Sequence, residues 1–105
     1  MWRDDDYTAW IYIMTCEDRP GLVKVGLSSD PVRRAFEIRK QGAALPTIEY
    51  ARRVWGARHV ERKAHDFLNA YHVRGESFRC SVSEATGAIC QAAENQRIEE
   101  QFRED

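Results

Sequence analysis

Two short apolar runs near the start of the chain predict a β-hairpin. Residues 10–14 (Trp-Ile-Tyr-Ile-Met) are aromatic and β-branched, which is typical of a buried strand. Residues 22–27 alternate between apolar and polar positions, with Lys24 on the more polar face. The turn-forming residues 17–21 (Glu-Asp-Arg-Pro-Gly) separate the two runs. We therefore expect the runs to pair as antiparallel strands.

A helix is predicted directly after the hairpin. Asp30 is a favourable N-cap, because its carboxylate accepts from the first free N–H groups, and Pro31 suits the first helical position. We expect the helix to continue to about Lys40. Its buried face is expected to carry Ala35 and Phe36.

The second half of the chain predicts strand, helix, short strand and helix in turn. Residues 48–55 alternate, but both faces mix polar and apolar side chains, as in an edge strand. Apolar positions at helical spacing predict a helix over about residues 57–71. Residues 76–80 are short and extended. Ser81 with Glu84 forms a capping box that opens a last helix, which nearly reaches the end of the chain.

The spacing of apolar residues changes between a period of two, typical of strands, and a period of about 3.6, typical of helices. This alternation predicts one α+β domain over residues 1–105. Its centre is a small antiparallel β-sheet of about three strands flanked by helices. Residues 1–6 form an acidic leader, and about residues 83–105 form a C-terminal helix with an acidic tail. The expected core residues are apolar positions of these elements: Trp10, Ile11, Ile13, Val23, Val25, Phe36, Phe67, Leu68 and Ile89.

Composition narrows the class of protein. Hydrophobic residues make up 43% of the chain and charged residues 31%, which is the balance of a globular domain. The longest uncharged apolar run, residues 7–16, is too short to span a bilayer, and no signal peptide is evident. Cys16, Cys80 and Cys90 have no CxxC spacing, which argues against a disulfide scaffold or a structural zinc site. We expect a cytoplasmic domain without a membrane partner.

The net charge of −1 conceals a segregation of charge. Residues 19–79 hold thirteen Lys or Arg against six Asp or Glu, whereas residues 84–105 have a net charge of −4. A basic middle suits a polyanion such as nucleic acid, although an ordinary mixed surface is the alternative. Arg33 and Arg34 stand in the first turn of a helix, where they oppose the helix dipole. A bound phosphate would offset that cost.

Single residues of this chain leave their roles open. Glu61 and His65 lie one turn apart on a predicted helix, so they could share a metal, or they could be a helix-terminal acid and a surface histidine. Tyr12 alone is typical of a core tyrosine, and Lys24 alone is typical of a solvent-facing lysine. Their order along the chain carries more information than any one of them.

That order resembles the GIY-YIG nuclease superfamily. Residues 10–12 (Trp-Ile-Tyr) stand where the family has Gly-Ile-Tyr, and residues 24–26 (Lys-Val-Gly) stand where it has Tyr-Ile-Gly. Arg34 matches the family arginine, and Glu61 matches its metal-binding glutamate.

The resemblance is closer to the small, phage-associated stand-alone branch of that superfamily. In this branch lysine often replaces the second tyrosine, as Lys24 does here. Residues 75–78 (Gly-Glu-Ser-Phe) match its Gly-Glu-aromatic-Phe step. The resemblance covers about residues 7–90, which is most of the chain.

The resemblance implies metal-dependent hydrolysis of phosphodiester bonds in DNA. Glu61 would hold Mg²⁺ or Mn²⁺, and Arg34 would stabilise the charge that develops on phosphorus. Tyr12 would orient or deprotonate the attacking water, with Lys24 on the neighbouring strand or the metal lowering its pKa. Lys24 could also replace the missing tyrosine or hold the phosphate. Further side chains would contact DNA phosphates: Arg33, Arg39, Lys40, Arg52, Arg53, Arg58, Arg62, Lys63 and His65.

Three departures from the family leave two alternatives open. The first glycine is Trp10, the second tyrosine is Lys24, and the family asparagine has no firm counterpart. One alternative is a nucleic-acid-binding module of the same fold that is catalytically weak or inactive. Metal-dependent nicking of DNA would distinguish it from a nuclease. The other is a small protein-interaction domain whose C-terminal helix binds a protein partner, in which case no salt-sensitive DNA binding is expected at all.

Overall fold

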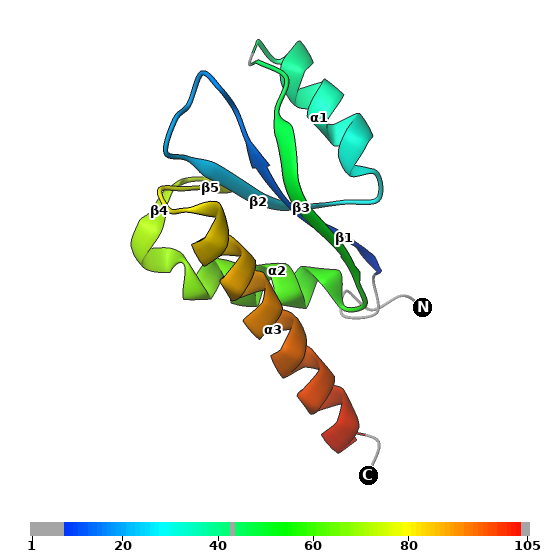
Figure 1. Cartoon of the computed structure of the whole chain (residues 1–105). Coiled ribbons are helices and arrows are strands. Elements are labelled where there is room, and N and C mark those ends of the chain that lie inside the picture. The colour runs from blue at the N-terminus through cyan, green and yellow to red at the C-terminus, as the bar shows by residue number, and fades with distance from the viewer. Residues whose placement is uncertain (1–7, 43, 104–105) are drawn as a thin grey trace.

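The chain folds as a five-stranded antiparallel sheet with helices on both faces, which confirms the expected α+β class (Figure 1). The computed structural model describes residues 8–42 and 44–103, with side chains up to Arg97. The acidic leader at residues 1–6 and the last two residues of the acidic tail therefore lie outside the described residues. The elements in chain order are β1 (Ala9–Thr15), β2 (Val23–Ser28), α1 (Pro31–Lys40), β3 (Thr47–Val54), α2 (Ala57–Phe67), the short 3₁₀ helix η2 (Asn69–Tyr71), β4 (His72–Arg74), β5 (Ser77–Phe78) and α3 (Val82–Arg103).

The strands lie in the order β3-β1-β2-β5-β4. The expected hairpin forms between β1 and β2, where Tyr12 lies opposite Gly26 and Met14 lies opposite Lys24. The expected edge strand is β3, which pairs with the other side of β1. The predicted count of about three strands is too low, because β4 and β5 are only three and two residues long. Segments this short do not show the alternation that identifies a strand.

The early end of β5 leaves part of the β2 edge uncovered. β5 pairs with Val23 and Lys24 of β2, and the N–H of Val25 then donates to the carbonyl of Glu76, at 2.9 Å. Beyond this point the described residues place no strand along this edge of β2, and Gly26 pairs only with β1 on the other side. The edge of β2 is therefore open from the Val25 carbonyl through Gly26. Side chains from either face of the sheet can approach each other there.

The two faces of the sheet bury cores of different size. Helices α2 and α3 cover one face, and α1 lies on the opposite side (Figure 1). The α1 face holds a small cluster of Tyr12, Met14, Ala35 and Ile38. The other face holds the main core, which includes Ile11, Ile13, Val23, Val25, Val60, Ala64, Leu68, Phe78, Ala85 and Ile89. Within the described ranges no helix, not even the 22-residue α3, has the length and apolar character needed to span a bilayer.

Local capping signals explain where two of the helices begin. Asp30 accepts from the N–H of Arg33 at 3.1 Å, so it is the N-cap of α1 as predicted. Ser81 and Glu84 exchange two hydrogen bonds at the start of α3, which confirms the capping box. Helix α2 instead follows Gly56, whose φ of 65° lies in the left-handed region that favours glycine.

Three of the expected core residues are exposed instead. Trp10, Phe36 and Phe67 are 37%, 48% and 47% exposed. In α1 the residues that face the sheet are Ala35 and Ile38, so Phe36 lies beside the buried stripe rather than on it. The other expected core residues are buried: Ile11, Ile13, Val23, Val25, Leu68 and Ile89.

We predict that Ile38→Ala lowers the free energy of unfolding by about 2–4 kcal/mol, because it leaves a cavity under α1. Phe36→Ala should change it by about 0.5 kcal/mol or less, as expected for a surface position. Chemical denaturation of both variants beside the wild type measures these changes. Equal losses would instead indicate that α1 packs through Phe36.

Candidate active site

The Tyr12 hydroxyl lies against the backbone of Gly26 on the neighbouring strand. A Cβ atom added to Gly26 would lie 2.6 Å from Tyr12 Oη and 2.6 Å from Glu76 Oε1. These distances are shorter than any ordinary contact of a Cβ atom. Only glycine at this position lets the Tyr12 hydroxyl and the Glu76 carboxylate meet over the strand, which gives the final glycine of residues 24–26 a physical reason.

Tyr12 donates a hydrogen bond to Glu76, with an oxygen–oxygen distance of 3.2 Å. Burial of the ring and the negative charge of Glu76 raise the pKa of Tyr12 to about 12, although the hydrogen bond and charge of Arg34 act in the opposite direction. The Tyr12 side chain is fully buried. The hydroxyl therefore keeps its proton near neutral pH and acts as a donor to Glu76.

Arg34 reaches the same hydroxyl from the first turn of α1. Its backbone N–H donates to the carbonyl of Asp30, so the N-cap of α1 also fixes the place of this side chain. The hydrogen bond with Tyr12 is the main cause that raises the pKa of Arg34. The guanidinium also lies 3.7 Å from a carboxylate oxygen of Glu37, and the Arg34 side chain is 32% exposed. It is therefore held in place and still accessible to a ligand.

His65 ties α2 to the open edge of β2. Its Nε2 lies 2.8 Å from the carbonyl of Val25, which can only accept, so Nε2 is the donor. The N–H of Val25 is bonded to Glu76 on the same edge. The imidazole also packs edge-on against Phe78, with ring centroids 4.9 Å apart. His65 was predicted to contact substrate, and its Nε2 is instead engaged with backbone.

Glu61 stands one turn before His65 on α2, and it is half-buried. Burial is the main cause that raises the pKa of Glu61, and the charge of Glu76 adds to it, while His65 and Arg58 oppose the increase. The interaction with Glu76 means that the two carboxylates lie within electrostatic range of each other. Glu76, which accepts the hydrogen bond of Tyr12 from the α1 face, is therefore also within electrostatic range of Glu61 on α2.

The pair of carboxylates fits a hard divalent cation. Glu61 and Glu76 repel each other, and a cation between carboxylates relieves such repulsion. Mg²⁺ in proteins is commonly held by one or two carboxylates, with water and substrate phosphate filling its other positions. In the part of the chain that the structure describes, no group of three or more His, Cys, Asp or Glu is suited to a metal, so the site does not match a closed zinc centre.

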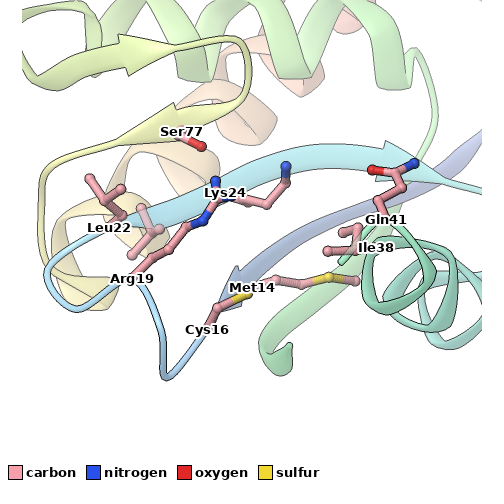
Figure 2. A pocket seen from close by; sticks show the side chains of 9 residues that line it. Met14, Cys16, Arg19, Leu22, Lys24, Ile38, Gln41 and Ser77 are labelled. Carbon is pink, nitrogen blue, oxygen red and sulfur yellow. The ribbon is translucent and has the colours of Figure 1, made fainter. Parts of the chain in front are cut away.

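Lys24 lies away from the Tyr12 hydroxyl. On β1 its partner is Met14, and its charge is not among the causes that set the pKa of Tyr12. The expectation that Lys24 lowers the pKa of Tyr12 is therefore wrong. Lys24 instead lines a neighbouring cavity of about 110 Å³ and, together with Arg19, lowers the pKa of Cys16 against the larger effect of burial (Figure 2).

The predicted phosphate-binding residues of the helices are largely exposed. Arg33 lies in the first turn of α1, whereas Arg39 and Lys40 lie in its last turn, where cations suit the helix dipole without any ligand. Arg58 is exposed in the first turn of α2, near Glu61. Arg33 is therefore next to Arg34 in the sequence, and Arg58 is the member of this group whose charge acts on Glu61.

Arg52 and Arg53 of β3 point to opposite faces of the sheet. Arg53 lies opposite Trp10 on β1, and Arg52 lies opposite Ile11. Trp10 shares the face of Tyr12, because successive side chains of a strand alternate. Arg53 therefore belongs to the candidate site's face, and Arg52 belongs to the face that α2 and α3 cover.

Glu76 is the residue that sequence reasoning missed. It was recognised only within residues 75–78 and was not placed in the site. Its signal was an acidic residue inside a motif of the resemblance, within a stretch that is otherwise rich in positive charge. The contact with Tyr12 spans 64 positions, so only the folded chain reveals it.

Comparison with known proteins adds a family match. The T5orf172 domain matches residues 9–92, which run from β1 into α3 and include Tyr12, Arg34, Glu61 and Glu76. Searches among curated proteins and among solved structures gave no match.

We predict that the free energy of unfolding depends on Tyr12 at alkaline pH. The pKa of Tyr12 is raised on folding, from 10.0 to about 12, so its contribution is complete below pH 10 and is lost as the pH rises to 12. Relative to Tyr12→Phe, the wild type should lose roughly 2–3 kcal/mol across this window. Denaturation of both proteins between pH 8 and 12 measures the difference. A difference that stays constant with pH would mean that the hydroxyl is solvated.

Proposed function

The chain belongs to the T5orf172 domain family, and from this membership and the site described above we propose that it is a metal-dependent endonuclease of the GIY-YIG type that hydrolyses phosphodiester bonds of DNA. Domains of this family are phage-associated and are described as nuclease-related, which supports the proposal. The observation that carries it is the contact of Arg34, Tyr12 and Glu76 beside Gly26, with Glu61 within electrostatic range of Glu76.

Arg34 is the group that receives the phosphate. Its guanidinium is positioned by Tyr12 and Glu37 before any substrate arrives, and about a third of the side chain remains exposed. Guanidinium groups match the oxygens of a phosphate and stabilise the negative charge that develops when phosphorus is attacked. The N-cap that fixes the first turn of α1 thus contributes to the reaction through Arg34.

Glu76 is the group that takes the proton from the attacking water. Tyr12 is buried and its pKa is about 12, so it is a poor base, whereas the Glu76 carboxylate is half-exposed. As the water oxygen bonds to phosphorus, its proton moves to Glu76 and the bond from phosphorus to the leaving 3′-oxygen breaks. The leaving oxygen takes a proton from solvent. Tyr12 is then a positioning residue that holds the Glu76 carboxylate in place.

Glu61 is the residue that would hold Mg²⁺ or Mn²⁺, and the charge of Glu76 acts on the same carboxylate. When bound, the cation would supply positive charge for the phosphate oxygens. Arg58 and His65 lower the pKa of Glu61 against the effect of burial, and so favour the ionised form that a cation needs.

We predict that Glu61→Gln abolishes metal-dependent cleavage and leaves the fold and most DNA affinity intact. Glutamine keeps the volume of the side chain, but it lacks the formal charge that draws Mg²⁺ from its water shell. The measurement is nicking of supercoiled plasmid with Mg²⁺, with Mn²⁺ and with EDTA, beside the thermal midpoint of unfolding.

The matched control for this variant is Glu94→Gln on α3, where an exposed carboxylate pairs with Arg97. It makes the same chemical change away from the site and should nick like the wild type. Undiminished nicking by Glu61→Gln would remove Glu61 from the mechanism. DNA binding by the wild type without any metal-dependent nicking would favour the alternative of a non-catalytic binding module.

We also predict that duplex DNA binds with a log–log salt slope of about −4 to −5, as expected when four to six phosphates are neutralised. Arg53→Ala should make the slope shallower by about 0.9, because Arg53 shares the face of Tyr12. Arg52→Ala, on the opposite face, is the matched control and should leave the slope unchanged. Fluorescence anisotropy at several salt concentrations measures all three slopes. An affinity that does not change with salt concentration would favour a protein-interaction domain.

A further inference from the structure

A cavity of about 110 Å³ lies next to the candidate active site, on the same face of the sheet. Arg19, Lys24, Ser77 and Gln41 all line this cavity, and Figure 2 labels each of them. Arg19 comes from the turn between β1 and β2, Lys24 from β2, Ser77 from β5 and Gln41 from the end of α1. Four separate segments thus bring two cations, a hydroxyl and an amide to one hollow.

Both cations of the cavity affect the same group, the thiol of Cys16. Burial and the charge of Asp18 raise the pKa of Cys16, which lies in the cavity wall, and Arg19 and Lys24 both oppose that increase. Among residues 8–42 and 44–97, no carboxylate forms an ion pair with either cation. The positive charge of this cavity is therefore available to an anion. Its remaining wall includes the apolar side chains of Met14 and Ile38.

The cavity lies about two residues along β2 from Gly26, which marks the candidate active site. Gly26 lies opposite Tyr12, and Lys24 lies opposite Met14, so the two positions face the same way. Two residues along a strand correspond to about 6.6 Å. An extended nucleic-acid strand covers a similar distance between one phosphate and the next. A strand whose attacked phosphate lies beside Gly26 can therefore place a neighbouring phosphate over this cavity.

We propose that this cavity binds the phosphodiester group adjacent to the one that is cleaved, with Arg19 and Lys24 as its cations and Ser77 as a further donor. The apolar wall then contacts the sugar of the same nucleotide. Lys24 acts in binding rather than in proton transfer. This inference rests on the proposed function and assigns its substrate a second point of attachment.

Cys16 provides a direct reporter for the test. In a protein with Cys80→Ser and Cys90→Ser, Cys16 is the single remaining thiol, and its alkylation by iodoacetamide can be followed by mass spectrometry. Duplex DNA in EDTA, where no cleavage occurs, should slow this alkylation several-fold. Arg19→Gln should remove most of that protection and make the salt slope of binding shallower by about 0.9.

Arg97→Gln is the matched control, because it removes one arginine charge from α3, on the other side of the sheet. It should leave both the protection and the salt slope unchanged. If Arg19→Gln behaves like Arg97→Gln, or if bound DNA does not slow alkylation of Cys16, the cavity is not a phosphate site. Circular dichroism of each variant checks that it is folded, and Lys24→Gln repeats the measurement from the neighbouring strand.

The source of the phosphate is tested with two oligonucleotides of the same sequence, one with a 5′-phosphate and one with a 5′-hydroxyl. Equal protection of Cys16 is expected, because the cavity takes a phosphate from within the strand. Protection that requires the 5′-phosphate would overturn this assignment in favour of a strand end. Metal-dependent nicking by the wild type without protection of Cys16 would remove only the cavity proposal, whereas absence of DNA binding would remove the proposed function as well.

Discussion

The arrangement of the candidate site depends on which groups form hydrogen bonds with the backbone of β2 along its open edge. The N–H of Val25 is bonded to Glu76, and its carbonyl, on the same edge, is bonded to His65 instead of to another strand. Buried backbone groups must be paired, so β5 can end early only because a side chain of α2 completes the pairing. A longer β5 would cover the edge and keep Glu61 apart from Tyr12. The short strand is therefore what allows both faces of the sheet to contribute to one site.

The unequal cores on the two faces have a related effect. The α2–α3 face buries a large apolar cluster, which supplies most of the hydrophobic stabilisation. Among the described residues, the α1 face holds a cluster of four buried side chains, of which Tyr12 carries a hydroxyl that must be hydrogen-bonded. Glu76 and Arg34 satisfy that hydroxyl. A polar network is thus placed where the apolar core is small and the ligand can approach.

The features predicted correctly from the sequence are those that local signals control. The hairpin, the N-cap at Asp30 and the capping box at Ser81 each depend on a few adjacent residues, and the structure confirms all three. The buried side of α1 was misjudged because a short helix offers two stripes of similar polarity, and the chosen one contained Phe36. The partner of Lys24 depends on strand register, which the loop between the strands does not reveal. The role of Glu76 required the fold itself.

The hydrogen bond from His65 to Val25 has a consequence for how the joint between α2 and β2 responds to acid. Histidine commonly makes a contact sensitive to pH near neutrality, because one of its nitrogens changes from acceptor to donor. Here the contact needs only a proton on Nε2, which is present both in the imidazolium and in the neutral tautomer that the carbonyl selects. Either protonation state therefore preserves the anchor. The position of α2 against the β2 edge therefore depends on a single N–H donor.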